Sequence, residues 1–478
     1  MTAKFETVHA RLGASFFDPV AAADFPKHTL RYRNDRAAET IGLDDLNDAN
    51  WVDHFGRFKP FEESFPEPLA LRYHGHQFRV YNPDIGDGRG FLFAQCRDLN
   101  DGRLLDLGTK GSGTTPYSRS GDGRLTLKGG VREVLATTRL QALGVYTSKS
   151  LSLIETGEAL ERHDEPSPTR SAVLVRLAHS HIRIGTFQRL AFEDDTDAIA
   201  QLVDHCIEHY HADLNGSDTG ARALALFRRV GAESARLCAQ WMAAGFVHGV
   251  LNTDNLNITG ESFDYGPYRF LPVYEPGFTA AYFDETGLYA YGRQPEAVHW
   301  ALCRLAECLL PFVSREDLAE ALTVFDAVFP TVLQEAFLRR LGLAGEGGAP
   351  AQTLLASVFR FLRDSGVAPD QFFHDWFGGL QREQQALNSP GGYAYGEAGF
   401  KEVRDALAEF EAHAATSEIL KDDLMQAERP VTLLYDDIEA LWARIDQQDD
   451  WSAFEAKQAD LDRMIDLFAP LYQADKAV

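Results

Sequence analysis

The chain has 478 residues, too many for one small domain, and its 45% apolar and 24% charged residues exclude a mainly disordered state. Its 46 basic and 71 acidic residues give a net charge of −25 at pH 7, which argues against general binding to nucleic acid or to an anionic membrane. No stretch has the roughly 18 consecutive apolar residues of a membrane span, and the N-terminal residues lack the apolar core of a signal peptide.

The first part of the chain, to about residue 180, predicts strands. Short β-type runs at 89–96, 102–111 and 171–178 alternate with Asp-Gly turn dipeptides. One helical pattern interrupts them at 129–144, where apolar residues recur on one side and Gly144 marks the end. These features predict a β-rich N-terminal lobe over residues 1–185.

After about residue 190 the apolar spacing becomes helical. Segments 220–245 and 295–312 carry apolar side chains at three-to-four spacing, and a polar segment lies between them. The last stretch is also helical and acidic, after a glycine-rich start at 388–399 that predicts a loop. The chain therefore predicts an α+β fold, with a helical C-terminal lobe over residues 186–390 and a helical extension over residues 391–478.

The first candidate phosphate contact is the segment Gly86-Asp-Gly88-Arg89-Gly. Its glycines would let backbone N–H groups approach an anion, and Arg89 could pair with that anion. Taken alone, such a run is more often a plain hairpin turn.

The second candidate is Lys110, which ends the β-type run at 102–111. A glycine- and hydroxyl-rich loop follows, and then Glu133 on the predicted helix. A lysine on a strand followed by a glutamate on the next helix is the layout of protein kinases, in which the pair fixes the ammonium near phosphate oxygens. Any single such pair is more often a surface lysine and a solvated glutamate. Asp122 and Gly123, in the loop, offer a further phosphate or ribose contact.

The third candidate is a pair of arginines, Arg176 and Arg183, that flank a turn. Arginine binds phosphate with two parallel hydrogen bonds, so two converging arginines would make a strong clamp. Without the other motifs, two solvated arginines would be the simpler interpretation.

The most informative motif lies in the polar segment, where His248 and Asn255 have the spacing of the kinase catalytic loop and Asp264-Tyr-Gly follows. Asn255 and Asp264 supply hard oxygen ligands suited to Mg²⁺ or Mn²⁺. Val250 stands where kinases have the catalytic Asp and cannot accept a proton, whereas Asp254 stands directly before Asn255. The pattern predicts a kinase-like metal site with a relocated base.

Together these motifs resemble those of the selenoprotein O family, pseudokinases that act as protein adenylyltransferases. The matching strings lie in family order from about residue 70 to 310: HGHQF (74–78), IGDGRG (85–90), KGSGTTPYSRSGDGR (110–124), VREVLA (131–136), AVLVRLAHSHIRIGTF (172–187), GFVHGVLNTDNLNITGESFDYGPY (245–268) and YAYGRQP (289–295). The resemblance implies a protein-kinase-like bilobal fold that binds ATP in a flipped orientation with Mg²⁺ or Mn²⁺. It also implies transfer of AMP to Ser, Thr or Tyr hydroxyls of proteins, the chain itself included, with release of pyrophosphate.

The resemblance assigns residues as well. The residues that it implies contact the nucleotide are Gly86, Gly88, Arg89, Lys110, Asp122, Gly123, Glu133, Arg176, Arg183 and Asp264. The residues that it implies bind metal are Asn255 and Asp264. The residue that it implies acts as the base is Asp254. The chain departs from the family in three places. Relatives often end in a Cys-x-x-Cys or Cys-x-x-selenocysteine motif, whereas the last cysteine here is Cys308. The segment after about residue 310 is divergent and lacks the Asn-Pro…Arg-Asn motif of the family. Arg79 follows HGHQF where relatives commonly have Gly, a minor change.

Two other functions stay open at this point: a conventional kinase-type phosphotransferase and a non-catalytic scaffold that binds ATP. For each we expect no nucleic-acid or membrane partner, because the chain is acidic. The five cysteines are spread widely and form no Cys-x-x-Cys pair, which predicts reduced thiols in a cytoplasmic protein.

Overall fold

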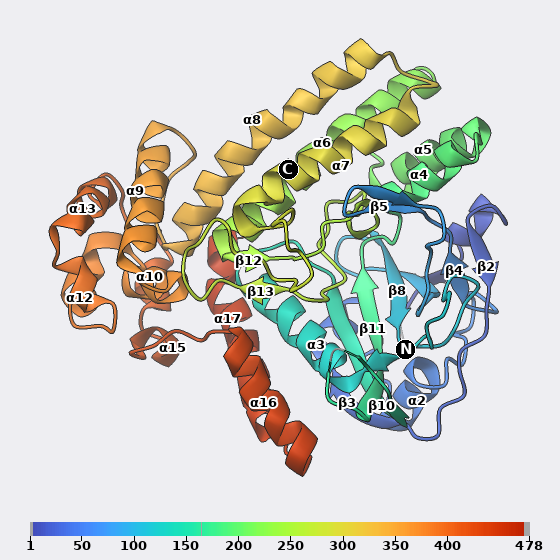
Figure 1. Ribbon diagram of the computed structural model, residues 1–478, viewed down its shortest axis with the longest axis horizontal. Coiled ribbons are helices and arrows are strands. Elements are labelled where there is room, and N and C mark those ends of the chain that lie inside the picture. Colours follow the sequence, from blue (N-terminus) through green and yellow to red (C-terminus); the bar gives the residue numbers. More distant parts are fainter. Residues whose placement is uncertain (1–2, 164, 473–478) are drawn as a thin grey trace.

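The computed structural model describes residues 3–163 and 165–472, and it has a β-rich N-terminal lobe and a helical C-terminal region (Figure 1). The lobe is built on an antiparallel sheet of nine strands, with the order β2-β4-β7-β8-β11-β10-β3, β1 beside β7 and β9 beside β11. The strands are β1 Phe5–Glu6, β2 Phe17–Pro19, β3 Thr29–Arg33, β4 Leu69–Leu71, β5 Gly75–Gln77, β6 Val80–Asn82, β7 Leu92–Arg97, β8 Leu104–Lys110, β9 Leu125–Thr126, β10 Lys149–Leu160, β11 Thr169–Ala178, β12 Phe246–Val247 and β13 Arg269–Phe270. The three predicted β-type runs form the neighbouring strands β7, β8 and β11, so this part of the prediction is confirmed.

The predicted helix at 129–144 is α3 (Leu127–Ala142). It begins two residues earlier than predicted because Thr126 caps it: the Thr126 hydroxyl accepts the N–H of Gly129 at 3.1 Å. It ends before Gly144, whose φ of 75° is the left-handed conformation that commonly follows a helix. One side of α3 packs on β10 and β11, and α17 (Ser452–Tyr472) packs along it as well.

The C-terminal region is almost entirely helical. Its helices are α4 Ile184–Phe192, α5 Thr196–Tyr210, α6 Thr219–Ala244, α7 Gln294–Leu309, α8 Arg315–Arg340, α9 Ala349–Ser365, α10 Pro369–Asp375, α11 Glu383–Ala386, α12 Gly392–Tyr395, α13 Lys401–Leu407, α14 Thr416–Ile419, α15 Asp423–Gln426, α16 Tyr435–Gln448 and α17, while α1 Asp35–Thr40 and α2 Asp48–Phe55 belong to the N-terminal lobe. The two helices predicted at 220–245 and 295–312 are α6 and α7. The segment between them holds β12, β13 and a short 3₁₀ turn, Thr253–Asn255. This arrangement confirms the predicted α+β class with two lobes.

Helix α8 is, by length and composition alone, apolar enough to cross a membrane. In the structure it lies along α6 at one edge of the molecule (Figure 1) and buries Leu318, Ala321 and Phe325 against its neighbours. Core helices of soluble proteins have the same composition, so α8 is weak support for a membrane contact.

The loop predicted at 388–399 is partly helical and packed. Tyr395 on α12 is buried among aromatic rings, including Phe361 on α9 and Trp376. This apolar cluster includes residues from 337 to 407, so it extends across the predicted domain boundary at 390/391.

Candidate active site

Lys110, at the end of β8, faces two carboxylates from different lobes. Its Nζ lies 2.6 Å from Glu133 Oε2 on α3 and 2.6 Å from Asp264 Oδ1 in the C-terminal region. Arg176, on the neighbouring strand β11, places Nη1 3.4 Å from one oxygen of each of the same carboxylates. The side chains of Lys110, Glu133 and Arg176 are almost fully buried, so each charge depends on its partners for compensation. The structure thus brings together four of the residues that the sequence singled out, and we call these four the Lys110 cluster.

Asp264 is held in an unusual backbone conformation and in a strongly positive environment. Its φ is +62°, a left-handed value that Asp tolerates better than most residues. Burial alone would raise the pKa of Asp264, but Lys110, Arg176 and Arg89 hold that pKa well below its ordinary value. Arg89 is exposed and forms no ion pair with any described residue, so its charge is available to an incoming anion.

Arg183 joins the glycine segment at 86–90 to residues 248–255, the predicted catalytic loop. It is the N-cap residue of α4, and its Nη1 donates to the backbone oxygen of Asp254 at 3.1 Å. Its Nη2 lies 3.2 Å from Asp87 Oδ1, and its guanidinium stacks over the ring of Tyr73 at 4.2 Å from the centroid. Arg183 therefore has its position fixed on three sides, while its charge faces Asp254 and Asp264.

Asp254 lies in the 3₁₀ turn Thr253–Asn255 and is buried without a side-chain partner. Within the described residues its Oδ1 accepts no hydrogen bond. Burial, with a smaller contribution from the charge of Asp264, raises the pKa of Asp254 to about 6 against the opposing effect of Arg183. A buried carboxylate with an unpaired oxygen and a raised pKa is typical of a catalytic acid or base.

Two glycines allow other elements to approach Asp254 closely. A Cβ added to Gly185, at the start of α4, would lie 2.2 Å from the backbone oxygen of His74. A Cβ added to Gly75, on β5, would lie 2.9 Å from Asp254 Oδ1. The predicted base, Asp254, therefore lies in a gap that a side chain at either glycine would close.

Asn255 and Asp264 each keep an oxygen available for a cation. The Nδ2 group of Asn255 donates to the Val250 carbonyl at 2.9 Å, which fixes the amide, and Asn255 Oδ1 has no hydrogen-bond partner among the described residues. Asp264 Oδ2 likewise has no such partner there. Across the described residues, no group of three or more His, Cys, Asp or Glu side chains forms a complete metal site. Two protein oxygens completed by phosphate and water are a typical set for Mg²⁺, so the residues present fit such an ion.

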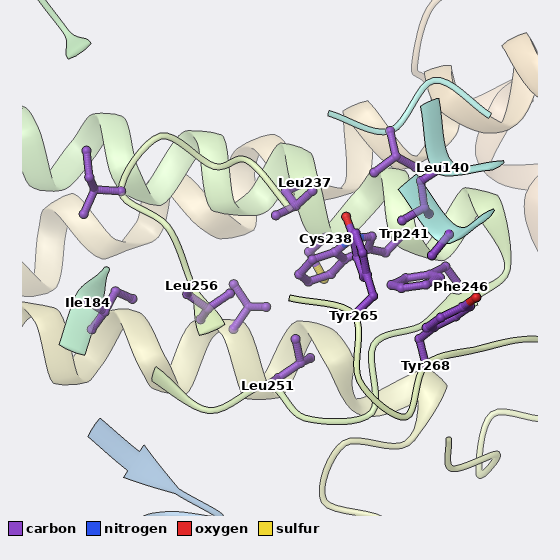
Figure 2. Packing of buried hydrophobic residues seen from close by; sticks show 14 of the residues in the cluster. Leu140, Ile184, Leu237, Cys238, Trp241, Phe246, Leu251, Leu256, Tyr265 and Tyr268 are labelled. Carbon is purple, nitrogen blue, oxygen red and sulfur yellow. The ribbon is translucent and has the colours of Figure 1, made fainter. Parts of the chain in front are cut away.

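The catalytic loop is held in place by apolar side chains behind it. Figure 2 shows Leu251 and Tyr265 turned toward the part of α6 that carries Trp241. His248, whose ring centroid lies 5.6 Å from that of Trp241, has Nε2 3.1 Å from the backbone oxygen of Phe263, directly before Asp264. The apolar cluster therefore fixes both ends of the segment that carries the two predicted metal ligands.

The other predicted nucleotide contacts lie in two loops that pack on each other. A Cβ on Gly86 would lie 2.5 Å from the ring of Tyr117, and one on Gly88 would lie 2.9 Å from the Tyr117 carbonyl. Gly123 has a φ of 70°, and its carbonyl accepts the N–H of Gly113 at 3.2 Å. Asp122 is half exposed and pairs with Arg162 at 2.8 Å, so the structure does not bring it into the Lys110 cluster. Its role with the nucleotide stays a prediction.

Sequence reasoning missed Asp87 and His181. Asp87 stands between two glycines of the candidate phosphate segment, yet it pairs with Arg183 and also accepts the N–H of Leu71 at 3.1 Å. The backbone N–H of His181 donates to Asp106 Oδ2 at 2.8 Å, and its ring lies against Gly108 on β8. The signal for Asp87 was its place in a glycine run, whereas only the fold reveals His181.

Comparisons with known proteins identify the family of the chain. The family model described as Protein adenylyltransferase SelO matches residues 1–461. The Protein nucleotidyltransferase YdiU of Synechocystis is 53% identical over 350 residues, 72% of each chain, and that of Gloeobacter violaceus is 46% identical over 459 residues, 94% of this chain and 93% of the other. Among solved structures, ROP2 from Toxoplasma gondii, described as a virulence factor with a protein-kinase fold and no enzymatic activity, is 12% identical with a TM-score of 0.26, covering 78% of this chain and 95% of its own.

The matched segment includes every residue of the Lys110 cluster and of the catalytic loop. With a family model over most of the chain and relatives of this identity and coverage, the chain belongs to the SelO family of protein adenylyltransferases, as its motifs indicated.

Proposed function

We propose that this protein transfers AMP from ATP to Ser, Thr or Tyr hydroxyls of proteins and releases pyrophosphate. The observation that carries the proposal is Asp254, a buried and unpaired carboxylate with a pKa of about 6, directly before a metal-type Asn255. Val250 occupies the position of the usual kinase base. Family membership supports nucleotidyl transfer, and the family description specifies the adenylyl group.

The cationic side chains would hold the phosphates of ATP. Lys110 and Arg176 are at present neutralised by Glu133 and Asp264, and Arg89 is exposed beside them. An incoming triphosphate would take hydrogen bonds from Lys110, Arg176 and Arg183 while Glu133 keeps Lys110 in position. Cations on the terminal phosphates make pyrophosphate a better leaving group, because they stabilise the charge that it acquires.

Asp254 would accept the proton of the attacking hydroxyl. The acceptor oxygen forms a bond to the α-phosphorus, the bond from that phosphorus to the bridging oxygen breaks, and the hydroxyl proton passes to the Asp254 carboxylate. A carboxylate with a pKa near 6 is a better proton acceptor than an ordinary Asp, and it is still mostly ionised at pH 7. Asn255 and Asp264 would hold Mg²⁺ or Mn²⁺, which supplies neutralisation of charge on the phosphates.

The deciding experiment uses ATP labelled at either the α- or the γ-phosphate, with protein acceptors and Mg²⁺ or Mn²⁺. We expect label from the α-position on protein, detected after gel separation and as an added AMP mass in intact-mass spectrometry. Label from the γ-position alone would support the conventional phosphotransferase. ATP binding without any transfer would support the non-catalytic scaffold.

We also propose that the enzyme works in a reducing compartment such as the cytoplasm. All five cysteines are free thiols, and Cys303 is the one that is not fully buried. Reduced thiols of this kind are typical of cytoplasmic proteins. Fractionation of cells that carry a tagged copy tests this location.

A further inference from the structure

The catalytic loop is bordered by an exposed aromatic ridge, which we define as Phe78, Val80, Tyr81, Phe192, Tyr282 and Phe283. Val80, Phe192, Tyr282 and Phe283 are 70%, 59%, 81% and 46% exposed. Ring contacts join its members in two groups: Phe192 stacks on Tyr81 at 5.2 Å, and Phe283 lies 5.8 Å from Phe78 and 5.1 Å from Tyr282. The hairpin of β5 and β6, whose residues Gln77 and Val80 are paired, carries members of both groups. Exposed apolar side chains gathered in this way mark interaction sites in soluble proteins.

Three hydrogen bonds fix the ridge to the loop that carries Asp254. The backbone N–H of His76 donates to Thr253 Oγ1 at 2.7 Å, and that of Phe78 donates to Asn252 Oδ1 at 3.0 Å. The hydroxyl of Tyr289, whose ring lies 5.0 Å from that of Phe78, donates to the same oxygen at 2.9 Å. A chain bound on the ridge would therefore have a fixed position relative to the base.

The ridge includes a strained turn. Phe78 and Arg79 have φ values of 50° and 64° and form a two-residue turn between the paired residues Gln77 and Val80. Two successive left-handed residues are the geometry of a type I′ turn, for which Asn-Gly is the usual sequence. Left-handed non-glycine residues are strained, and they cluster at binding and active sites. Here the strained turn holds the Phe78 ring against Phe283 and Tyr289.

The charge around the ridge is acidic. Asp84, Asp194 and Glu285 are exposed and form no ion pair with any described residue. The nearby cations Arg79 and Arg293 both pair with the single carboxylate of Glu296. With the chain as a whole at −25, an anionic lipid surface or a second copy of this acidic chain would be repelled.

We propose that the ridge is the docking surface for the acceptor protein, and that it selects a segment whose target hydroxyl has an apolar side chain and Lys or Arg nearby. The inference rests on the proposed function, because it needs an acceptor that approaches Asp254. The apolar side chain would pack on Tyr282 and Phe283, and the basic side chains would pair with Glu285 and Asp84.

The test compares two peptide acceptors that share a central Tyr and flanking Leu residues and differ only in Lys or Glu at the outer positions. AMP transfer to each from α-labelled ATP is measured for the wild type, the double variant Tyr282→Ser/Phe283→Ser and the variant Glu285→Lys. Matched controls are Tyr393→Ser and Glu397→Lys, whose exposed side chains lie at or just after α12, far from β5 in Figure 1. ATP affinity and release of AMP to water are recorded for every variant.

We expect the wild type to prefer the Lys peptide by about tenfold in kcat/KM. We expect both ridge variants to raise the KM for the Lys peptide several-fold, while ATP affinity and release of AMP to water stay unchanged. Three results would each overturn the docking proposal. The first is equal transfer to the two peptides, and the second is no transfer to either peptide while AMP is still released to water. The third is an equal effect of the ridge variants and the control variants. Absence of any α-phosphate turnover in the wild type would overturn the proposed function instead.

Discussion

Lys110 Nζ lies 2.6 Å from Asp264 Oδ1, an ion pair between the two lobes at the centre of the candidate site. The sequence motifs predict that Lys110 contacts phosphate and that Asp264 binds a cation. If both predictions hold, phosphate and cation would compete with this ion pair for the same two side chains. We therefore expect phosphate binding and metal binding to be coupled through the pair.

We predict that Lys110→Met lowers both ATP affinity and stability. Among the described residues, the change leaves Arg176 as the remaining ion-pair partner of the carboxylates of Glu133 and Asp264. Breaking a buried pair costs about 3 kcal/mol or more. Lys128→Met is the control, because Lys128 forms a more exposed pair with Glu439 and should cost less than about 1 kcal/mol. Urea unfolding and titration calorimetry measure the two effects, and equal losses of stability in the two variants would contradict the prediction.

We predict that Asp254→Asn abolishes AMP transfer and stabilises the protein. The folded-state pKa is about 6 against an ordinary 3.8, so the free energy of unfolding contributed by Asp254 falls as pH rises through this window. At pH 7.5 the gain from Asn should approach about 3 kcal/mol, since one pKa unit corresponds to about 1.4 kcal/mol. Unfolding in a chelator without nucleotide, at pH 5.0 and 7.5, should show the larger gain at the higher pH. The same gain at both values would exclude this charge as the cause.

We predict that Asp264→Ala removes the effect of metal on ATP binding. Lys110 and Arg176 lose one of their two anionic partners, so the affinity for ATP in EDTA should stay equal or increase, while Mg²⁺ no longer improves it. Glu133→Ala should weaken ATP binding with and without metal, because Lys110 loses the group that orients it. Titration calorimetry in both buffers distinguishes the variants. A metal effect that persists in Asp264→Ala would place the cation elsewhere.

We predict that Gly90→Ala is strongly destabilising. Its Cβ would lie 2.1 Å from the backbone oxygen of Thr109, so the start of β7 and the end of β8 would have to separate. We expect a loss above about 2 kcal/mol together with weaker ATP binding, because Lys110 directly follows Thr109. Gly399→Ala has no neighbour within 4 Å of the added carbon and should change stability by less than about 0.5 kcal/mol. Thermal unfolding of both variants provides the comparison.

Much of the fold could be predicted because its signals are local. The strands β7, β8 and β11 and the helices α3, α6 and α7 follow from the period of their apolar residues. The longest described strand, β10, was missed because its alternation lasts only to Leu153, where Ile154 follows directly and Gly157 comes soon after. Its pairing with β11, which includes two register shifts, extends the strand beyond that pattern. The residues joined at Lys110 could be named because the motifs carry fixed spacing.

The remaining features depend on contacts between distant segments. Arg79 was taken as a minor departure, yet it occupies a left-handed turn and reaches Glu296 on α7 at 2.6 Å. Asp122 was assigned to the nucleotide from its loop alone, whereas Arg162 occupies its carboxylate. No local pattern states which partner a charged side chain finds after folding.

The packing of α17 on α3 makes the candidate site depend on a distant part of the chain. Gln458 donates to Thr138 Oγ1 at 2.8 Å, and Met464 contacts Arg139, so the helix that carries Glu133 is held by residues 320 and 325 positions later in the sequence. A shortened variant that ends before residue 452 keeps Lys110, Arg176, Asp254 and Asp264 but lacks this support for α3. Such a variant should therefore bind ATP more weakly than the chain of 478 residues, although every candidate site residue is present.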